Sequence, residues 1–185
     1  MIFNENVFDD FPVLRTGRLL LREITPADAK EIFAIYSSDA AMKYFGKDTF
    51  KTIDEAYEMI ERVRKGFRDR EGIRWGISFK DSDMLIGSGG FWRLIKPHFR
   101  AEIGYDLHPD YWGKGIMTEA VKAMIEFGFG KMNLHSIEAN TDPENAASAR
   151  LLGKNGFVKE GIFRESYYYN GVFLDSHIYS LIKKN

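Results

Sequence analysis

The sequence contains no cysteine, which excludes disulfides, thiolate metal sites and a cysteine nucleophile. It has no excess of charge of one sign either, because 26 basic residues stand against 27 acidic ones, for a net charge of −1. Binding to nucleic acid or to a membrane surface needs a strong basic field, so neither partner is expected. The four histidines show no metal-ligand spacing, and we expect no metal site.

Long apolar runs are absent as well. No stretch approaches the roughly 18 apolar residues of a transmembrane helix, and the acidic first ten residues do not resemble a secretory signal. We therefore expect a cytoplasmic protein. The chain has no repeat, low-complexity tract or Pro/Ser-rich linker, so residues 1–185 are predicted to form a single domain.

Hydrophobic periodicity and capping signals predict the order of the elements. Thr25 and Thr52 begin two helices, each with an acidic residue three positions later as in a capping box. Residues 73–79 alternate as in a half-buried strand, and the pair Asn170-Gly171 is typical of a hairpin turn. Further helices are expected at 119–129 and from 142 to about 155, and further strands at 18–24, 84–95, 99–107, 134–140, 157–165 and 172–182.

This order predicts an α/β (α+β) fold: a mixed, mostly antiparallel central sheet flanked by helices. The helix at 119–129 is the expected crossover between two parallel strands, because parallel neighbours need a long connection.

The strongest local signal is a strand, a glycine-containing turn and a helix start in succession. The turn holds Trp112, Gly113, Lys114, Gly115, Ile116, Met117 and Thr118. Glycines let the backbone approach a ligand closely, and the first amides of a helix attract anions, so a pyrophosphate could bind here with Lys114 as a cation. The alternative is a tight turn without a ligand. The turn is neither a P-loop nor a GxGxxG motif, since Thr118 takes the third glycine position.

A second signal is the pair Asn145 and Ser148, which lie three residues apart and share a helix face. They begin a run that reads NxxSxxLLxxxGF and ends at Phe157. Asn and Ser near a helix start also serve as simple caps, and this alternative stays open.

Together the two segments resemble the signature of the GNAT superfamily of acyl-CoA N-acyltransferases. Its motif (Q/R)xxGx(G/A) reads here as Trp112 to Met117, with Trp112 in place of Gln/Arg and Met117 in place of Gly/Ala. The opening Thr16 to Arg22 and the tail from Glu160 to Leu181 are similar to the Rim-type ribosomal-protein-alanine N-acetyltransferases. The resemblance covers roughly Thr16 to Leu181.

The resemblance implies a GNAT-like fold and an enzyme that uses acetyl-CoA as cosubstrate, without a metal. An amine attacks the thioester directly, and a main-chain N–H on the strand 102–107 stabilises the tetrahedral oxyanion. Cofactor contacts are implied for the glycine turn and for Ile103, Gly104, Tyr105, Asn140, Asn145 and Ser148.

The sequence offers one candidate for each of the two proton-transfer roles in catalysis. Ser148 is the expected proton donor to the leaving thiolate, and Glu102 is the candidate base. Some Rim-type relatives carry a Glu where this chain has Tyr167, so that residue cannot be carried over. Glu102 as a structural carboxylate, with a tyrosine or a water chain as base, is the alternative. Trp92, Tyr167 and Tyr168 are expected to line the acceptor slot.

The missing glutamate favours an acceptor that is easily deprotonated. An α-amino group has a pKa of about 7.7–8.0, against about 10.4 for lysine. The N-terminal amine of a (ribosomal) protein is therefore the expected acceptor. The alternatives are a small amine (amino acid, polyamine or antibiotic) and a non-catalytic acyl-CoA-binding module. Both a monomer and a homodimer are compatible with the sequence.

Overall fold

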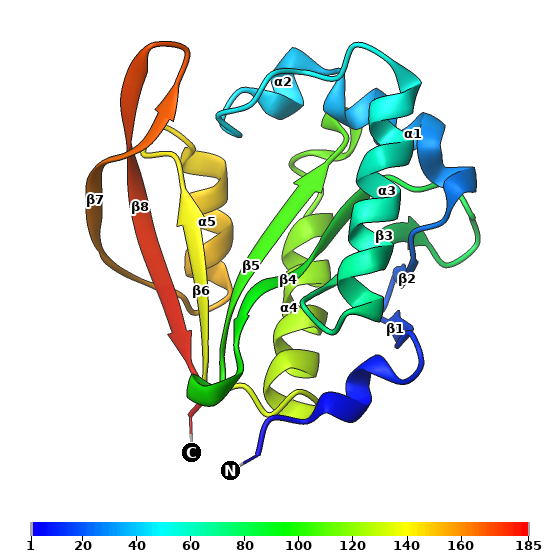
Figure 1. The fold of residues 1–185 in the computed structure, drawn as a ribbon, viewed down its shortest axis with the longest axis vertical. Coiled ribbons are helices and arrows are strands. Elements are labelled where there is room, and N and C mark those ends of the chain that lie inside the picture. The colour runs from blue at the N-terminus through cyan, green and yellow to red at the C-terminus, as the bar shows by residue number, and fades with distance from the viewer. Residues whose placement is uncertain (1, 185) are drawn as a thin grey trace.

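The computed structural model describes residues 2–184, which form a twisted sheet with helices on both faces (Figure 1). Its strands are β1 (Leu14–Arg15), β2 (Leu19–Glu23), β3 (Ile73–Phe79), β4 (Gly87–Ile95), β5 (Arg100–Leu107), β6 (Ser136–Thr141), β7 (Val158–Tyr169) and β8 (Val172–Ile182). Its α-helices are α1 (Ala29–Tyr36), α2 (Asp39–Met42), α3 (Ile53–Arg68), α4 (Ile116–Gly130) and α5 (Ala146–Lys154). Short 3-10 turns are η1 (Glu5–Phe8), η2 (Pro26–Asp28), η3 (Lys96–His98) and η4 (Pro109–Tyr111).

The eight strands have the order β1-β2-β3-β4-β5-β6-β8-β7. Within the described residues, β5 and β6 are the one parallel pair, and α4 connects them. This confirms the expected mixed, mostly antiparallel sheet and the crossover through residues 119–129.

The parallel pair is short and then opens. The ladder runs from Arg100↔Ser136 to Glu102↔Glu138 and stops there, although β5 continues to Leu107 and β6 to Thr141. Figure 1 shows the two strands side by side at one end and apart at the other. The divergence leaves a wedge-shaped gap in the middle of the sheet.

Two apolar clusters cover the two faces of the sheet. One gathers α1 and α3 around Ile32 and Ile60, and the other packs α4 against Trp75, whose ring lies 5.3 Å from that of Phe127. Strand β3 is therefore buried on both faces, with Trp75 in one cluster and Gly76 against Ile24 of the other. The expectation of a half-buried strand was wrong for this reason.

Local signals placed most element starts well. Both capping boxes are present, at Thr25 with Asp28 and at Thr52 with Glu55. The hairpin turn is confirmed by the positive φ values of Asn170 (49°) and Gly171 (82°), which a type I′ turn requires.

Several boundaries differ from the predicted ones, among them the start of β6 at Ser136 and the end of β7 at Tyr169. Helix α4 begins at Ile116, because the turn ends at Gly115 with a φ of 71°, and it runs through Gly130. Helix α5 begins four residues after Asp142, because the side chain of Asp142 accepts a bond from the Glu144 amide and closes a turn first. Strand β4 begins at Gly87 rather than Met84.

Candidate acetyl-transfer site

The glycine turn lies beyond the end of β5 and leads into α4. Gly113 and Gly115 both have positive φ, 73° and 71°, a region that favours glycine. The amide of Glu119 bonds to the carbonyl of Gly115 at 3.1 Å, so the amides of residues 116–118 precede the first intrahelical bond. Such amides, at the positive end of the helix dipole, suit an anion.

The side chains of the turn explain why its departures from the motif are compatible with the fold. Met117 is buried in the core at 6% exposure, and Ile116 lies beside it, so neither side chain covers the amides. The Trp112 indole donates to the Leu107 carbonyl at 2.8 Å and ties the turn to β5. The Lys114 ammonium folds back onto the Asp110 carbonyl at 2.8 Å.

Arg18 is the cation that lies over the turn, and the sequence did not single it out. Its Nη2 atom is 3.8 Å from the position that a Cβ on Gly115 would take, and its Nη1 atom donates to the Lys114 carbonyl at 3.1 Å. Glu119 in turn accepts from the Arg18 amide and its Nε atom, at 2.8 and 2.7 Å. Burial alone would raise the pKa of Glu119, but the bonds from Thr16 and Arg18 outweigh it and hold the pKa below its usual value. Arg18 therefore stays fixed beside the turn.

The gap between β5 and β6 opens into a cleft of about 1040 Å³. From β5 it is lined by Glu102, Ile103, Gly104 and Tyr105, and from β6 and α5 by Asn140, Thr141, Asn145 and Ser148. Oδ1 of Asn140 and Oγ1 of Thr141 are buried, with no hydrogen-bond partner within residues 2–184. Buried polar atoms are rarely left unpaired, so these two are ready partners for a ligand with polar groups.

Ser148 and Tyr105 form a hydroxyl pair across the gap, at 2.7 Å between their oxygens. Burial raises the pKa of Tyr105 to about 12, so its phenol keeps its proton at neutral pH. Asn145 accepts a bond from the Ser148 amide at 3.0 Å. The capping alternative therefore describes Asn145, while the Ser148 hydroxyl remains directed at the cleft.

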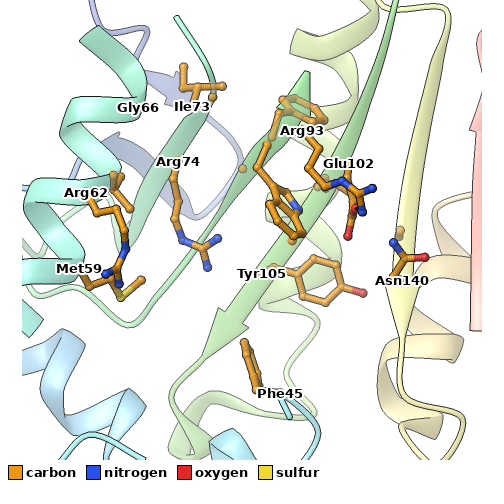
Figure 2. A pocket seen from close by; sticks show the side chains of 18 of the residues that line it. Phe45, Met59, Arg62, Gly66, Ile73, Arg74, Arg93, Glu102, Tyr105 and Asn140 are labelled. Atoms are coloured by element: carbon orange, nitrogen blue, oxygen red, sulfur yellow. Dashed lines mark hydrogen bonds and ion pairs between the residues drawn. The ribbon is translucent and has the colours of Figure 1, made fainter. Parts of the chain in front are cut away.

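Glu102 lies on the other face of β5 from Tyr105, as strand alternation requires. Figure 2 shows its carboxylate next to Arg93, and the Nη1–Oε2 distance is 3.0 Å. Strand β4 bulges between Trp92 and Ile95, and Arg93 takes a φ of 47° there, which turns its side chain onto Glu102. Burial raises the pKa of Glu102, although Asn140 and Arg93 act in the opposite direction.

Of the three residues predicted to line the acceptor slot, two line the cleft and one does not. Trp92, about half exposed, and Tyr167 line the cleft. The Tyr167 hydroxyl donates to the Gly46 carbonyl at 2.8 Å, which joins the β7–β8 hairpin to the loop after α2. Tyr168 does not line the cleft: it points to the opposite face of β7, where its ring packs 5.0 Å from Phe173.

A buried polar cluster under the cleft escaped the sequence analysis. The carboxylate of Asp106 accepts from the Tyr36 hydroxyl at 2.8 Å, the Ser88 hydroxyl at 2.7 Å and the Ser88 amide at 3.1 Å, and it pairs with Arg74. Burial, with Asp106 alongside, raises the pKa of Tyr36 and keeps it a donor. Part of the signal was present, because Arg74 is the one charged residue in the strand Ile73–Phe79.

Within residues 2–184, histidines and carboxylates nowhere gather in a group of three or more that could hold a metal ion. No helix in the same part of the chain is both long and apolar enough to cross a bilayer.

The family profile described as an acetyltransferase (GNAT) domain matches residues 18–158, and this decides the identity of the fold. The chain belongs to the GNAT acetyltransferases.

Relatives of this GNAT acetyltransferase are also named as N-acetyltransferases. The uncharacterized N-acetyltransferase YoaA of Bacillus subtilis is 42% identical over 173 residues, covering 94% of this chain and 98% of YoaA. The [ribosomal protein uS5]-alanine N-acetyltransferase of Escherichia coli is 26% identical and covers 88% of this chain and 86% of its own length. The crystal structure of the ribosomal-protein-S5-alanine acetyltransferase of Vibrio fischeri superposes with a TM-score of 0.81 at 27% identity, covering 92% and 96% of the two chains.

This GNAT acetyltransferase is thus an acetyl-CoA-dependent N-acetyltransferase. Its residues fit that cosubstrate: the α4 amides and Arg18 suit the pyrophosphate, and the unpaired oxygens of Asn140 and Thr141 suit the amide groups of the pantetheine arm.

Proposed function

We propose that this enzyme acetylates the N-terminal α-amino group of a ribosomal protein, through direct attack of the amine on acetyl-CoA. The observation that carries the proposal is the arrangement on β5: Glu102 on one face, Tyr105 with Ser148 on the other, and Gly104 between them. A base and a proton donor thus flank the point where the thioester must lie.

The protons balance in this arrangement. The amine nitrogen forms a bond to the thioester carbon and gives up a proton toward Glu102, directly or through water. Main-chain amides on the open edge of β5 stabilise the oxyanion. The carbon–sulfur bond then breaks, and the CoA thiolate takes a proton from the Ser148 hydroxyl, which Tyr105 resupplies across 2.7 Å.

The acceptor class follows from how much base strength is available. Burial raises the pKa of Glu102 against the opposing effect of Arg93, but a carboxylate remains a far weaker base than a lysine amine. At neutral pH roughly a tenth of α-amines are neutral, against well under a hundredth of lysine side chains. The similarity to the uS5-alanine N-acetyltransferases supports the same class, and a ribosomal substrate would place the reaction in the cytoplasm.

We also propose that the chain acts as one acetyltransferase domain, because strands from both ends of the chain join in one sheet. Two alternatives remain to be tested against this proposal: a small-amine acetyltransferase and a module that binds acyl-CoA without turnover.

The test measures CoA release and product mass with three acceptors: a peptide that begins with alanine, an N-blocked peptide with one lysine, and spermidine. We expect the first to exceed the others by at least tenfold in kcat/KM. Comparable turnover on the lysine peptide or on spermidine contradicts the α-amine proposal.

Thermal unfolding separates the non-catalytic alternative. Acetyl-CoA at about 100 times its Kd stabilises by roughly 2.7 kcal/mol, or about 5–10 °C for this size. A shift without CoA release from any acceptor would favour the binding module.

A further inference from the structure

Arg74 is held rigidly beneath the acceptor side of the cleft. Its Nε atom donates to the Ser88 hydroxyl at 2.9 Å, and its Nη2 atom pairs with Asp106. A guanidinium has five N–H donors in a fixed plane, so two anchored nitrogens also fix the direction of the third.

Two glycines let this side chain cross the sheet. Arg74 pairs with Gly90 across β3 and β4, and Gly90 pairs with Gly104 across β4 and β5. Since neither glycine carries a side chain, the guanidinium passes over β4 and reaches β5. In Figure 2 it extends from β3 toward the centre of the cleft.

The third nitrogen of Arg74 stays open to the cleft. A Cβ built on Gly104 would lie 4.0 Å from Nη1 of Arg74 and 3.7 Å from the indole Nε1 of Trp92. Among the described residues, Nη1 has no hydrogen-bond partner, and the Arg74 side chain keeps 21% of its surface exposed. Two N–H donors are therefore presented over Gly104.

Asp106 cannot be the base for this part of the cleft. Its two oxygens accept from Tyr36, from Ser88 twice and from Arg74. A buried ion pair contributes little to stability compared with apolar packing of the same volume. The cluster is better explained as a support that fixes Arg74.

We propose that Arg74 is a specificity-determining residue, whose free Nη1 donates to a carbonyl or carboxylate oxygen next to the acceptor amine. This inference rests on the proposed function. It assigns the acceptor class as an α-aminoacyl group, in which an sp² oxygen and the amine are attached to neighbouring carbons. A peptide N-terminus and a free amino acid share this chemistry.

The charge of Arg74 is already balanced by Asp106, so its effect on the acceptor comes from the N–H donors of Nη1 rather than from its charge. Polyamines carry no oxygen beside the amine and cannot accept a bond from Nη1.

The test compares two acceptor pairs in the wild-type enzyme and in Arg74→Lys. The first pair is alaninamide and propylamine, whose rates are compared per neutral amine because the neighbouring carbonyl of alaninamide also lowers the pKa of its amine. The second pair is an alanine-initiated peptide and free alanine. Lysine keeps a charge for Asp106 but cannot make the three-way contact. We expect the wild type to prefer alaninamide at least tenfold in kcat/KM, and Arg74→Lys to lose most of that preference.

Two controls show whether a change in acceptor preference is specific to Arg74. Arg64→Lys alters an arginine that pairs with Glu23 outside the cleft and should leave the preference unchanged. The thermal shift with acetyl-CoA should be the same in all three proteins, which shows that Arg74→Lys still folds and binds the cosubstrate.

The outcomes distinguish this inference from the proposed function. Equal rates on alaninamide and propylamine in the wild type, or an unchanged preference in Arg74→Lys, overturn the role of Arg74. If free alanine or alaninamide outperforms the peptide while the dependence on Arg74 persists, the role of Arg74 holds and the protein-N-terminus proposal fails.

Discussion

Gly104→Ala should lower the turnover of this enzyme without lowering its stability. The added Cβ would lie 3.7 Å from Trp92 Nε1 and 4.0 Å from Arg74 Nη1, which are ordinary van der Waals distances. Nothing in the fold has to move. The φ of Gly104 is not in the left-handed region, so the substitution also restricts the unfolded chain and adds about 0.4–1 kcal/mol to the free energy of unfolding.

The same methyl group occupies the space over β5 that the acceptor amine needs. Reacting atoms must approach to about 3–3.5 Å, and a displacement of about 1 Å can cost roughly 100-fold. We therefore expect kcat/KM for an alanine-initiated peptide to fall about 100-fold, with a melting temperature equal to or above that of the wild type.

The assay pairs steady-state CoA release with thermal unfolding, with and without acetyl-CoA. Gly153→Ala is the matched control, because a Cβ there meets nothing within 4 Å and the residue lies in α5. It should raise stability and leave turnover unchanged. Full activity in Gly104→Ala would refute the placement of the acceptor over Gly104, and a loss of folding would refute the packing argument.

Three further substitutions probe the remaining parts of the site. Glu102→Gln should lower kcat/KM about 100-fold or more. Protonation of the amine sets one acid limb in every variant; because burial raises the pKa of Glu102, the wild-type profile should steepen further at a pH above the usual glutamate range, and this second limb should vanish in the variant. Glu61→Gln, which alters an exposed carboxylate on α3, should keep both limbs, and a second limb that persists in Glu102→Gln excludes Glu102 as the base. Tyr105→Phe removes the bond to Ser148 and should lower kcat about tenfold; an unchanged kcat in single-turnover measurements would remove Tyr105 from the proton path. Gly115→Ala forces a residue with a Cβ to a φ of 71°, so we expect a loss of about 1–2 kcal/mol, a melting temperature lower by about 2–8 °C, and weaker acetyl-CoA binding by calorimetry; unaltered stability would show that the turn relaxes without cost.

Much of the fold was predictable because its signals are local. A capping box is complete within four residues, and an Asn-Gly turn needs only two, so Thr25, Thr52 and Asn170 each indicated an element boundary correctly. The glycine turn was predictable for the same reason, since both of its glycines adopt the positive φ that their residue type favours.

The acceptor side was not predictable, because it depends on register between strands. Arg74 reaches β5 only because Gly90 and Gly104 are paired with each other, and no sequence window contains all three. Arg93 meets Glu102 through a bulge in β4. Tyr168 was assigned to the acceptor slot together with its neighbour, yet alternation along β7 turns it away.

The short ladder between β5 and β6 has a mechanical consequence. Within residues 2–184, the ladder that joins β5 to β6 has three residue pairs, and beyond Glu102↔Glu138 the two strands share no further ladder pair, although side chains such as Tyr105 and Ser148 still meet across the gap. A cosubstrate bound in the gap between β5 and β6 would contact both strands and connect the two parts of the sheet until the product leaves. Amides of β6 past Glu138 should therefore exchange with solvent more slowly when acetyl-CoA is bound, and regain their faster exchange each time the product leaves.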